Sequence, residues 1–218
     1  MQKFLESLGQ KSINNVVDAT NFVMFDLGQP LHAFDAGQLV QNEVKLQYSV
    51  GVRRASSSEK LLALDDKEYL LADSMLVIVD GVSDKAIGIA GVKGGKPAGI
   101  SESTRDIIIE SANFDGASVR KTAAALKLRT DASSRYEQGI SPELCGYGMR
   151  AVVDLIVQIA GGEVAGFADS YPRVPQQKTV AATTSQINAI LGSKFSDANV
   201  ADVLTRLDVD PEVRVLVL

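Results

Sequence analysis

The segment that most constrains the fold runs from Ser12 to Asp35, with the sequence SINNVVDATNFVMFDLGQPLHAFD. Its apolar residues recur at spacings that place them on one face of a helix; they are Val16, Val17, Val23, Met24 and Leu27. Gly28 is placed to end this helix, and Pro30 cannot continue it. The segment therefore predicts a helix over Ser12–Gly28 that is followed by a tight turn.

The same helix contains more polar residues than stability alone requires. Asparagine, aspartate and threonine compete for backbone hydrogen bonds inside a helix, and here they occupy Asn14, Asn15, Asp18, Thr20 and Asn21. The only histidine of the chain, His32, follows the turn directly. We therefore expect Thr20, Asn21 and His32 to converge at the end of this helix.

The remaining sequence predicts an α+β fold: a mixed module with a layered β-sheet or sandwich core flanked by helices. Apolar and alternating runs predict strands at Val44–Val50, Leu76–Asp80, Ala86–Val92, Ile107–Ile109 and Val164–Pro172, with a hairpin over Leu61–Leu71 and loops at Arg53–Lys60 and Lys93–Gly99. Capping residues and apolar periodicity predict helices at 2–9, Gly116–Leu128 and Leu144–Ala160, and a loop or short helix at Thr130–Tyr136. After a linker, a strand at Thr179–Ala182 and helices at Ser185–Leu191 and Asp197–Leu207 predict a small, mainly helical unit that is truncated.

Composition limits the classes of protein that fit. The chain has 218 residues, of which 45% are apolar, and a single cysteine, Cys145. A core can therefore form without disulfides, in a reducing, cytoplasmic compartment. No apolar run approaches the ~18 residues of a membrane span, so no membrane partner is expected. Helical sequence begins at once and the chain stops in apolar residues, which we interpret as a fragment of a longer polypeptide.

Charge is distributed unevenly. A net charge of −5 argues against a protein that holds a long nucleic-acid duplex by charge alone. Between Arg120 and Arg135, however, five basic residues accompany one acidic residue, Asp131. This stretch is either a solvated helix face or a local patch that faces phosphate groups.

Glu110 and His32 are the candidates for chemistry. Glu110 directly follows a buried strand, so it is either a strand-end carboxylate bonded to a backbone N–H or a basic side chain, or a site carboxylate that binds a substrate hydroxyl or ammonium. A lone histidine is more often structural than catalytic, but the imidazole of His32 can position water or take a proton near neutral pH. Gly91, Gly94 and Gly95 leave room for a ligand at the backbone.

Other catalytic classes find less support in the sequence. The glycine spacing matches neither a Walker loop nor a dinucleotide fingerprint. No metal-ligand spacing is present, which disfavours a metal-dependent hydrolase, and there is no nucleophile elbow. A hydrolytic site in this chain would therefore work by holding water and substrate in place.

Four strings resemble one known family. INNVVDATNFVMFDLGQPLHAFD, IAGVKGG, STRDIIIESANFD and LRTDASSRYEQGISPEL, in this order, are similar to the beta subunit of bacterial phenylalanyl-tRNA synthetase. The resemblance runs from Met1 to about Tyr171. It implies that residues 1–174 form the tRNA-editing domain of that subunit. It also implies that residues 178–218 are the truncated start of the next small, helical, nucleic-acid-binding-like domain.

The resemblance also implies a function. The whole enzyme is a two-alpha, two-beta assembly that uses ATP and magnesium to join phenylalanine to its tRNA, and the alpha subunit carries that synthetic site. The fragment would need no cofactor of its own. It would hydrolyse tyrosine wrongly attached to the 3′ end of the tRNA and contribute to RNA binding, because a pocket that rejects a close analogue poorly needs such editing. The alternative is a non-catalytic tRNA-binding or assembly module.

The family pocket transfers to this chain residue by residue. His32 and Glu110 are the catalytic positions, and Glu110 is the acid that recognises the tyrosine hydroxyl. The substrate-binding positions are Lys11, Thr20, Asn21, Ala90, Gly91, Thr130 and Ala132, and no metal ligand is expected. Lys11, Lys93 and Gln138 differ from the residues common in the family, which is the sequence support for the non-catalytic alternative.

Overall fold

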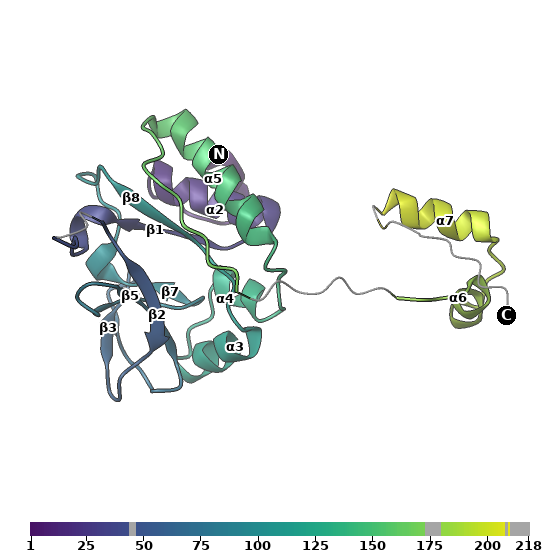
Figure 1. Cartoon of the computed structure of the whole chain (residues 1–218), viewed down its shortest axis with the longest axis horizontal. Coiled ribbons are helices and arrows are strands. Elements are labelled where there is room, and N and C mark those ends of the chain that lie inside the picture. The colour runs from purple at the N-terminus through teal and green to yellow at the C-terminus, as the bar shows by residue number, and fades with distance from the viewer. Residues whose placement is uncertain (44–46, 173–179, 208, 210–218) are drawn as a thin grey trace. The chain divides into compact units, whose positions relative to one another are not determined.

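The computed structural model describes residues 1–43, 47–172, 180–207 and 209, and it divides into two compact units, Met1–Gly166 and Phe167–Leu218. Figure 1 shows the order of the elements along the chain. The first unit contains α1 (Gln2–Ser7), α2 (Asn15–Leu27), β1 (Leu31–Asp35), β2 (Val50–Arg54), β3 (Lys60–Leu62), β4 (Glu68–Leu70), β5 (Leu76–Asp80), β6 (Ala86–Ile89), β7 (Lys93–Gly94), β8 (Ile107–Ser111), α3 (Gly116–Ala125), α4 (Asp131–Tyr136) and α5 (Leu144–Ala160), with short 3₁₀ turns at Ala36–Gln38 and Lys96–Ala98.

The predicted α+β class is confirmed. Among the described residues, β1 pairs with β8, β3 pairs with β4, and the remaining strands form a sheet in the order β2-β5-β6-β7. All of these pairs are antiparallel. The three sheets and the helices belong to segments that follow one another along the chain, as expected of an α+β fold rather than an alternating α/β fold.

The β1–β8 pair lies between a helical layer and the four-stranded sheet. Ala33 of β1 and Ile109 of β8 pack with α2 and α5, in a core that includes Val23 and Val152. Successive side chains of a strand point to opposite faces, so Phe34 packs on the other side, in a core shared with β5 and β6. Figure 1 shows α2 and α5 side by side over β1 and β8. His32 shares the face of Phe34, away from α2.

Capping fixes the ends of α2. The side chain of Asn14 accepts a hydrogen bond from the Val17 N–H, so the helix begins at Asn15 rather than at Ser12. Gly28 ends it in the left-handed conformation, with φ +82°, where a side chain would be strained. The predicted end of the helix is thus confirmed, and its start is shifted by the cap.

Several predicted segments differ from the structure; the strand expected over Ala86–Val92, for example, ends at Ile89. The strand expected at Val44–Val50 includes residues outside the described ranges, and β2 runs from Val50 to Arg54, into the expected loop. The segment Lys93–Gly99 is not a loop, because β7 pairs with β6 and the Gly95 N–H donates to the Ile87 carbonyl. No strand forms over Val164–Pro172, since no described strand pairs with this largely exposed segment.

The second unit contains the helices α6 (Thr184–Leu191) and α7 (Asp197–Arg206), both of which the sequence predicts. Thr183 and Ser196 begin them with reciprocal capping boxes. Val180–Ala182 is not a strand, and Thr179 of the same prediction lies outside the described residues. In the part of the chain that the structure describes, no helix combines the length and the apolar character that crossing a membrane requires.

Candidate active site

His32 and Glu110 lie opposite each other in the antiparallel pair of β1 and β8. Residues in such register point to the same face, with Cβ atoms about 5 Å apart. The strand pair therefore brings together two ionisable groups that are far apart in the sequence. Both side chains line one pocket with a volume of about 70 Å³.

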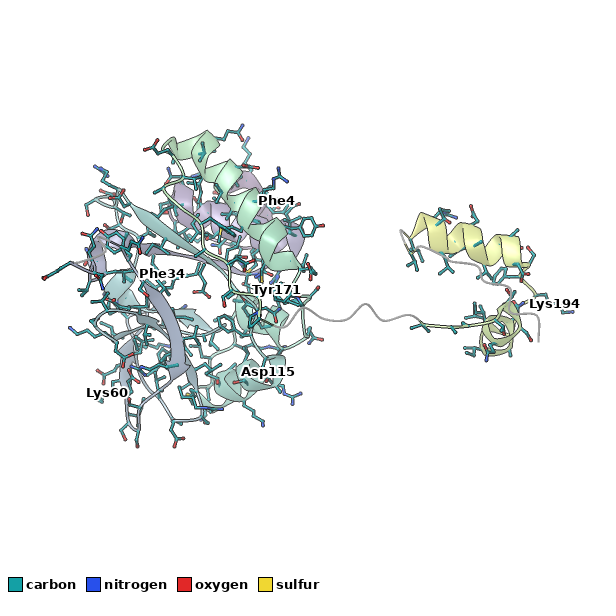
Figure 2. All side chains as sticks on the ribbon, viewed as in Figure 1. Phe4, Phe34, Lys60, Asp115, Tyr171 and Lys194 are labelled. Carbon is teal, nitrogen blue, oxygen red and sulfur yellow. The ribbon has the colours of Figure 1, made fainter. Side chains whose placement is uncertain are left out.

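The pocket is lined by residues of the β1–β8 pair, of the four-stranded sheet and of α4. Its lining comprises Pro30, Leu31, His32, Phe34, Ile78, Gly88, Ile89, Gly91, Val92, Lys93, Gly94, Glu110, Ala132 and Tyr136. Most of these residues are apolar or glycine, so the few polar groups stand out. Such a lining is typical of a small-ligand site, in which a few polar groups set the orientation of the ligand. Figure 2 labels Phe34, which lies in the interior of the first unit.

His32 is held in an apolar setting. Its ring meets the Phe34 ring edge-on, with ring centroids 4.6 Å apart. Burial lowers the pKa of His32 to about 4, so the imidazole is neutral at pH 7. The Nε2 atom is buried and has no hydrogen-bond partner among the described residues. Buried polar atoms are nearly always paired, so this atom marks a position that a ligand or water can satisfy.

Glu110 is also without a countercharge. Among the described residues, no hydrogen bond or ion pair to its carboxylate is found. The interpretation of Glu110 as a strand-end carboxylate bonded to a backbone N–H or a basic side chain therefore finds no support. Burial raises the pKa of Glu110 to about 7. Near neutral pH this group is therefore poised between its acid and its carboxylate, and either form can bind a substrate hydroxyl.

A buried hydrogen-bond network lies next to the pocket. Gln29 is fully buried, and its side-chain Nε2 donates to the carbonyls of Pro30 and Ala112, both at 2.9 Å. The Tyr136 hydroxyl donates to the same Ala112 carbonyl at 2.9 Å. Burial and the nearby Glu110 raise the pKa of Tyr136, so it remains a neutral phenol. Tyr136 and Gln29 thus fix the chain on both sides of the pocket.

Glycines allow the backbone to approach the imidazole. A Cβ atom at Gly94 would lie 2.4 Å from Cε1 of His32 and 2.7 Å from its Nε2. Gly91 has φ +68°, and a Cβ there would lie 2.9 Å from Val119 and 3.1 Å from both Phe114 and Tyr136. Only glycine fits either position without displacement, which gives the glycine-rich segment a physical role in shaping the pocket.

The structure brings together four of the predicted site residues, namely His32, Glu110, Gly91 and Ala132. Ala90 is buried beside them, in the core that contains Phe34, and its N–H donates to the Leu76 carbonyl. Thr130 caps α4 and donates its hydroxyl to the Val92 carbonyl at 2.8 Å. Thr130 thus fixes the wall that Ala132 forms.

Lys11, Thr20 and Asn21 do not line this pocket. Lys11 is exposed, and the buried Thr20 hydroxyl donates to the Val17 carbonyl within α2. The expected convergence with His32 is not observed, because strand alternation turns His32 away from α2. The polar residues of this helix instead serve its own structure: the Asp18 carboxylate accepts hydrogen bonds from the Ser12 hydroxyl and the Ile13 N–H.

Sequence reasoning missed Phe34 and Tyr136 as parts of the site. The period of two along His32–Phe34 is a signal that could have identified Phe34, since both residues share one face. No local pattern marks Tyr136, which reaches the pocket from α4. Gly94 was identified as a glycine that leaves room for a ligand at the backbone, but its close approach to the His32 ring was not predicted.

Within residues 1–43, 47–172, 180–207 and 209, no three histidine, cysteine or carboxylate side chains cluster closely enough to hold one ion. The ionisable residues that line the pocket are His32, Lys93, Glu110 and Tyr136.

The fold and the pocket define an α+β domain in which an acid and an imidazole, carried by paired strands, line a largely apolar pocket. Residues 1–161 match the B3/4 domain family, and the chain belongs to that family.

The chain also resembles curated relatives over nearly all of its length. It is 39% identical over 215 residues to the phenylalanine–tRNA ligase beta subunit of Clostridium acetobutylicum, and 37% identical over 214 residues to that of Clostridium tetani. With the beta subunit of Moorella thermoacetica it shares 39% identity over 211 residues. These alignments cover 96–98% of this chain but only 25–26% of each relative. The chain thus spans about a quarter of the length of the relatives it matches.

Proposed function

We propose that this chain is the editing part of a phenylalanine–tRNA ligase beta subunit and that it hydrolyses tyrosine attached to the tRNA. Membership of the B3/4 family and the similarity to the beta subunits support the enzyme class. The observation that carries the editing activity is the placement of His32 opposite Glu110 in one pocket. This pocket offers polar groups to a phenol while most of its lining is apolar.

Glu110 distinguishes tyrosine from phenylalanine in this proposal. The tyrosine hydroxyl donates a hydrogen bond to the Glu110 carboxylate, which has no partner among the described residues. Phenylalanine cannot make this bond, and its ring would leave a buried polar group unsatisfied. Such a loss costs about 1–3 kcal/mol, which corresponds to roughly 5- to 150-fold in selectivity at 1.36 kcal/mol per factor of ten.

His32 orients the reacting groups. Its pKa of about 4 makes it a weak base at pH 7, because an efficient general base has a pKa near the working pH. Its unpartnered Nε2 can instead hold a water molecule or the ester in place. Positioning of this kind supplies much of the rate acceleration in many hydrolytic sites.

The reaction is ester hydrolysis. The water oxygen bonds to the ester carbonyl carbon, and the bond from that carbon to the ribose oxygen breaks. The ribose oxygen takes a proton from the attacking water, so the products are free tyrosine and uncharged tRNA. A neighbouring hydroxyl of the terminal ribose assists in this proposal, because His32 is a weak base at pH 7 and Glu110, whose pKa is about 7, is engaged by the phenol.

The proposed setting is the cytoplasmic enzyme. The partners would be the 3′ end of the acylated tRNA and the alpha subunit of a two-alpha, two-beta assembly. ATP and magnesium would serve the synthetic reaction of that assembly, which takes place outside this chain. The editing reaction proposed for this chain uses neither.

Replacement of Glu110 with alanine tests the proposal. In the assembled enzyme, Glu110→Ala is expected to lower kcat/KM for tyrosyl-tRNA hydrolysis by about 5- to 150-fold, because the bond to the phenol is lost. Hydrolysis of phenylalanyl-tRNA, which never makes that bond, is expected to remain slow. Deacylation of the two labelled substrates measures both rates.

The matched control is Glu102→Ala, since Glu102 is exposed and lies outside the pocket. It is expected to hydrolyse tyrosyl-tRNA at the wild-type rate. Unchanged tyrosine selectivity in Glu110→Ala would contradict the role of Glu110. Absence of tyrosyl-tRNA hydrolysis by the wild-type assembly would instead favour a non-catalytic, tRNA-binding module.

A further inference from the structure

A second pocket lies on one face of α3. Arg120, Ala123 and Ala124 follow the spacing i, i+3, i+4, which places them on one side of α3. Lys127 comes after the end of this helix, and all four residues line the pocket. Leu128, Arg129 and Glu137 complete its lining, and its volume is about 360 Å³. The two alanines lie between long cationic side chains, so the helix surface is recessed where the alanines occur.

The charge of this pocket is opposite to that of the chain. Three cations and one carboxylate line it, in a chain whose net charge is −5. Arg129 pairs with Glu137. Among the described residues, neither Arg120 nor Lys127 has a carboxylate within ion-pair distance. The pocket thus presents an excess of positive charge that the described part of the protein leaves uncompensated.

Helix electrostatics account for only part of this arrangement. Lys127 follows the end of α3, where a cation is favoured by the negative end of the helix dipole. Arg120, however, is the fifth residue of α3, more than a turn from that end. Another cation of the same stretch, Arg135, is used internally: it pairs with Asp131 and lies over the Phe25 ring. In the described part of the chain, Arg120 and Lys127 therefore remain as cations without a carboxylate partner.

The second pocket is separated from the His32–Glu110 pocket by one short helix. Ala132 of α4 lines the first pocket, and Glu137, which directly follows α4, lines the second. The six residues of α4 span about 9 Å at 1.5 Å per residue. Figure 1 shows α3 and α4 as neighbours, and they are in contact.

We propose that the pocket formed by Arg120, Lys127 and Arg129 binds the phosphodiester backbone of the single-stranded RNA whose end enters the His32–Glu110 pocket. The recess is lined by several cations and by no aromatic ring that could stack on a base. Phosphate groups are the ligand that fits such a recess best. The inference rests on the proposed function, because that function places an RNA 3′ end within the first pocket. It adds the surface that holds the preceding phosphates.

The test is RNA binding by the double variant Arg120→Gln/Lys127→Gln in the full chain. The probe is a fluorescently labelled single-stranded RNA with the tRNA 3′-terminal sequence, followed by anisotropy at several salt concentrations. Each lost phosphate contact is expected to reduce the slope of log K against log salt by about 0.7, hence by about 1.4 for the double variant. The single variant Arg120→Lys is expected to keep most of the affinity that Arg120→Gln loses, since lysine keeps the charge.

The matched control is Lys67→Gln/Lys85→Gln, which removes the same charge from exposed positions outside both pockets. Its salt slope is expected to stay at the wild-type value. Equal slopes in the two double variants, or a slope unchanged from wild type in Arg120→Gln alone, would overturn the inference. Since the RNA carries no amino acid, this result is independent of tyrosyl-tRNA hydrolysis. A reduced slope together with unchanged hydrolysis in Glu110→Ala would support the surface and contradict the editing role.

Discussion

Glu110→Gln is expected to raise the free energy of unfolding by about 3 kcal/mol at pH 8 and to leave it nearly unchanged at pH 4. Burial raises the pKa of Glu110 from 4.5 to about 7 in the folded protein. Between these values the folded state binds more protons than the unfolded state, so the wild-type protein loses stability as the pH rises. The shift of 7 − 4.5 = 2.5 units corresponds to about 3 kcal/mol at ~1.36 kcal/mol per unit.

The measurement is urea unfolding of both proteins across this pH range. His32 contributes in the opposite direction, because its pKa of about 4 makes the wild-type protein lose stability as the pH falls from 6.5 toward 4. That contribution is present in both proteins and cancels in their difference. Glu102→Gln, at an exposed glutamate, serves as the control. A stability difference between Glu110→Gln and wild type that stays constant from pH 4 to pH 8 would show that Glu110 is not held in an unfavourable environment.

Gly94→Ala is expected to lower tyrosyl-tRNA hydrolysis by about 100-fold, which is the loss that a displacement of about 1 Å can cause at a catalytic group. The new methyl carbon would lie 2.4 Å from Cε1 of His32. The imidazole also packs against the Phe34 ring, so the new methyl group forces it out of its position. Deacylation by the assembled enzyme measures the loss, and circular dichroism verifies that the chain folds.

Gly146→Ala is the matched control for this substitution. Gly146 lies in α5, and a Cβ there meets no atom within 4 Å. Alanine at an open helix position is expected to stabilise the protein by about 0.5–1 kcal/mol and to leave hydrolysis unchanged. Hydrolysis at the wild-type rate in Gly94→Ala would mean that the position of His32 does not govern the reaction.

The sequence predicted those parts of the fold that local patterns determine. The LVIVD run is β5 over its whole length, and the apolar run that ends in glycine is α5. Asp115 caps α3 as expected, by accepting a hydrogen bond from the Ser118 N–H; Figure 2 labels Asp115. Each of these elements depends on residues close in the chain, for which propensity and capping chemistry suffice.

The family resemblance placed His32 and Glu110 in one pocket, but the sequence did not predict the pairing between distant segments that sets their register. The ladder of β1 with β8 joins residues 31–35 to 107–111, and this register alone sets His32 opposite Glu110. The helical pattern suggested instead that His32 would meet Thr20 and Asn21. Because side chains alternate between the two faces of β1, His32 points away from α2 when Ala33 packs against it. Only the pairing of β1 with β8 shows which of the two faces meets α2. In the same way, Lys93–Gly94 has no strand propensity and becomes β7 by pairing with β6.

The central claim is that the His32–Glu110 pocket recognises the tyrosine phenol. It is tested most directly by crystals of the protein soaked with tyrosine and, in parallel, with phenylalanine. Density for tyrosine is expected beside both residues, with the phenol oxygen at hydrogen-bond distance from the Glu110 carboxylate, and no comparable density is expected for phenylalanine. Tyrosine bound elsewhere, or bound in this pocket with its phenol pointing away from Glu110, would contradict the claim.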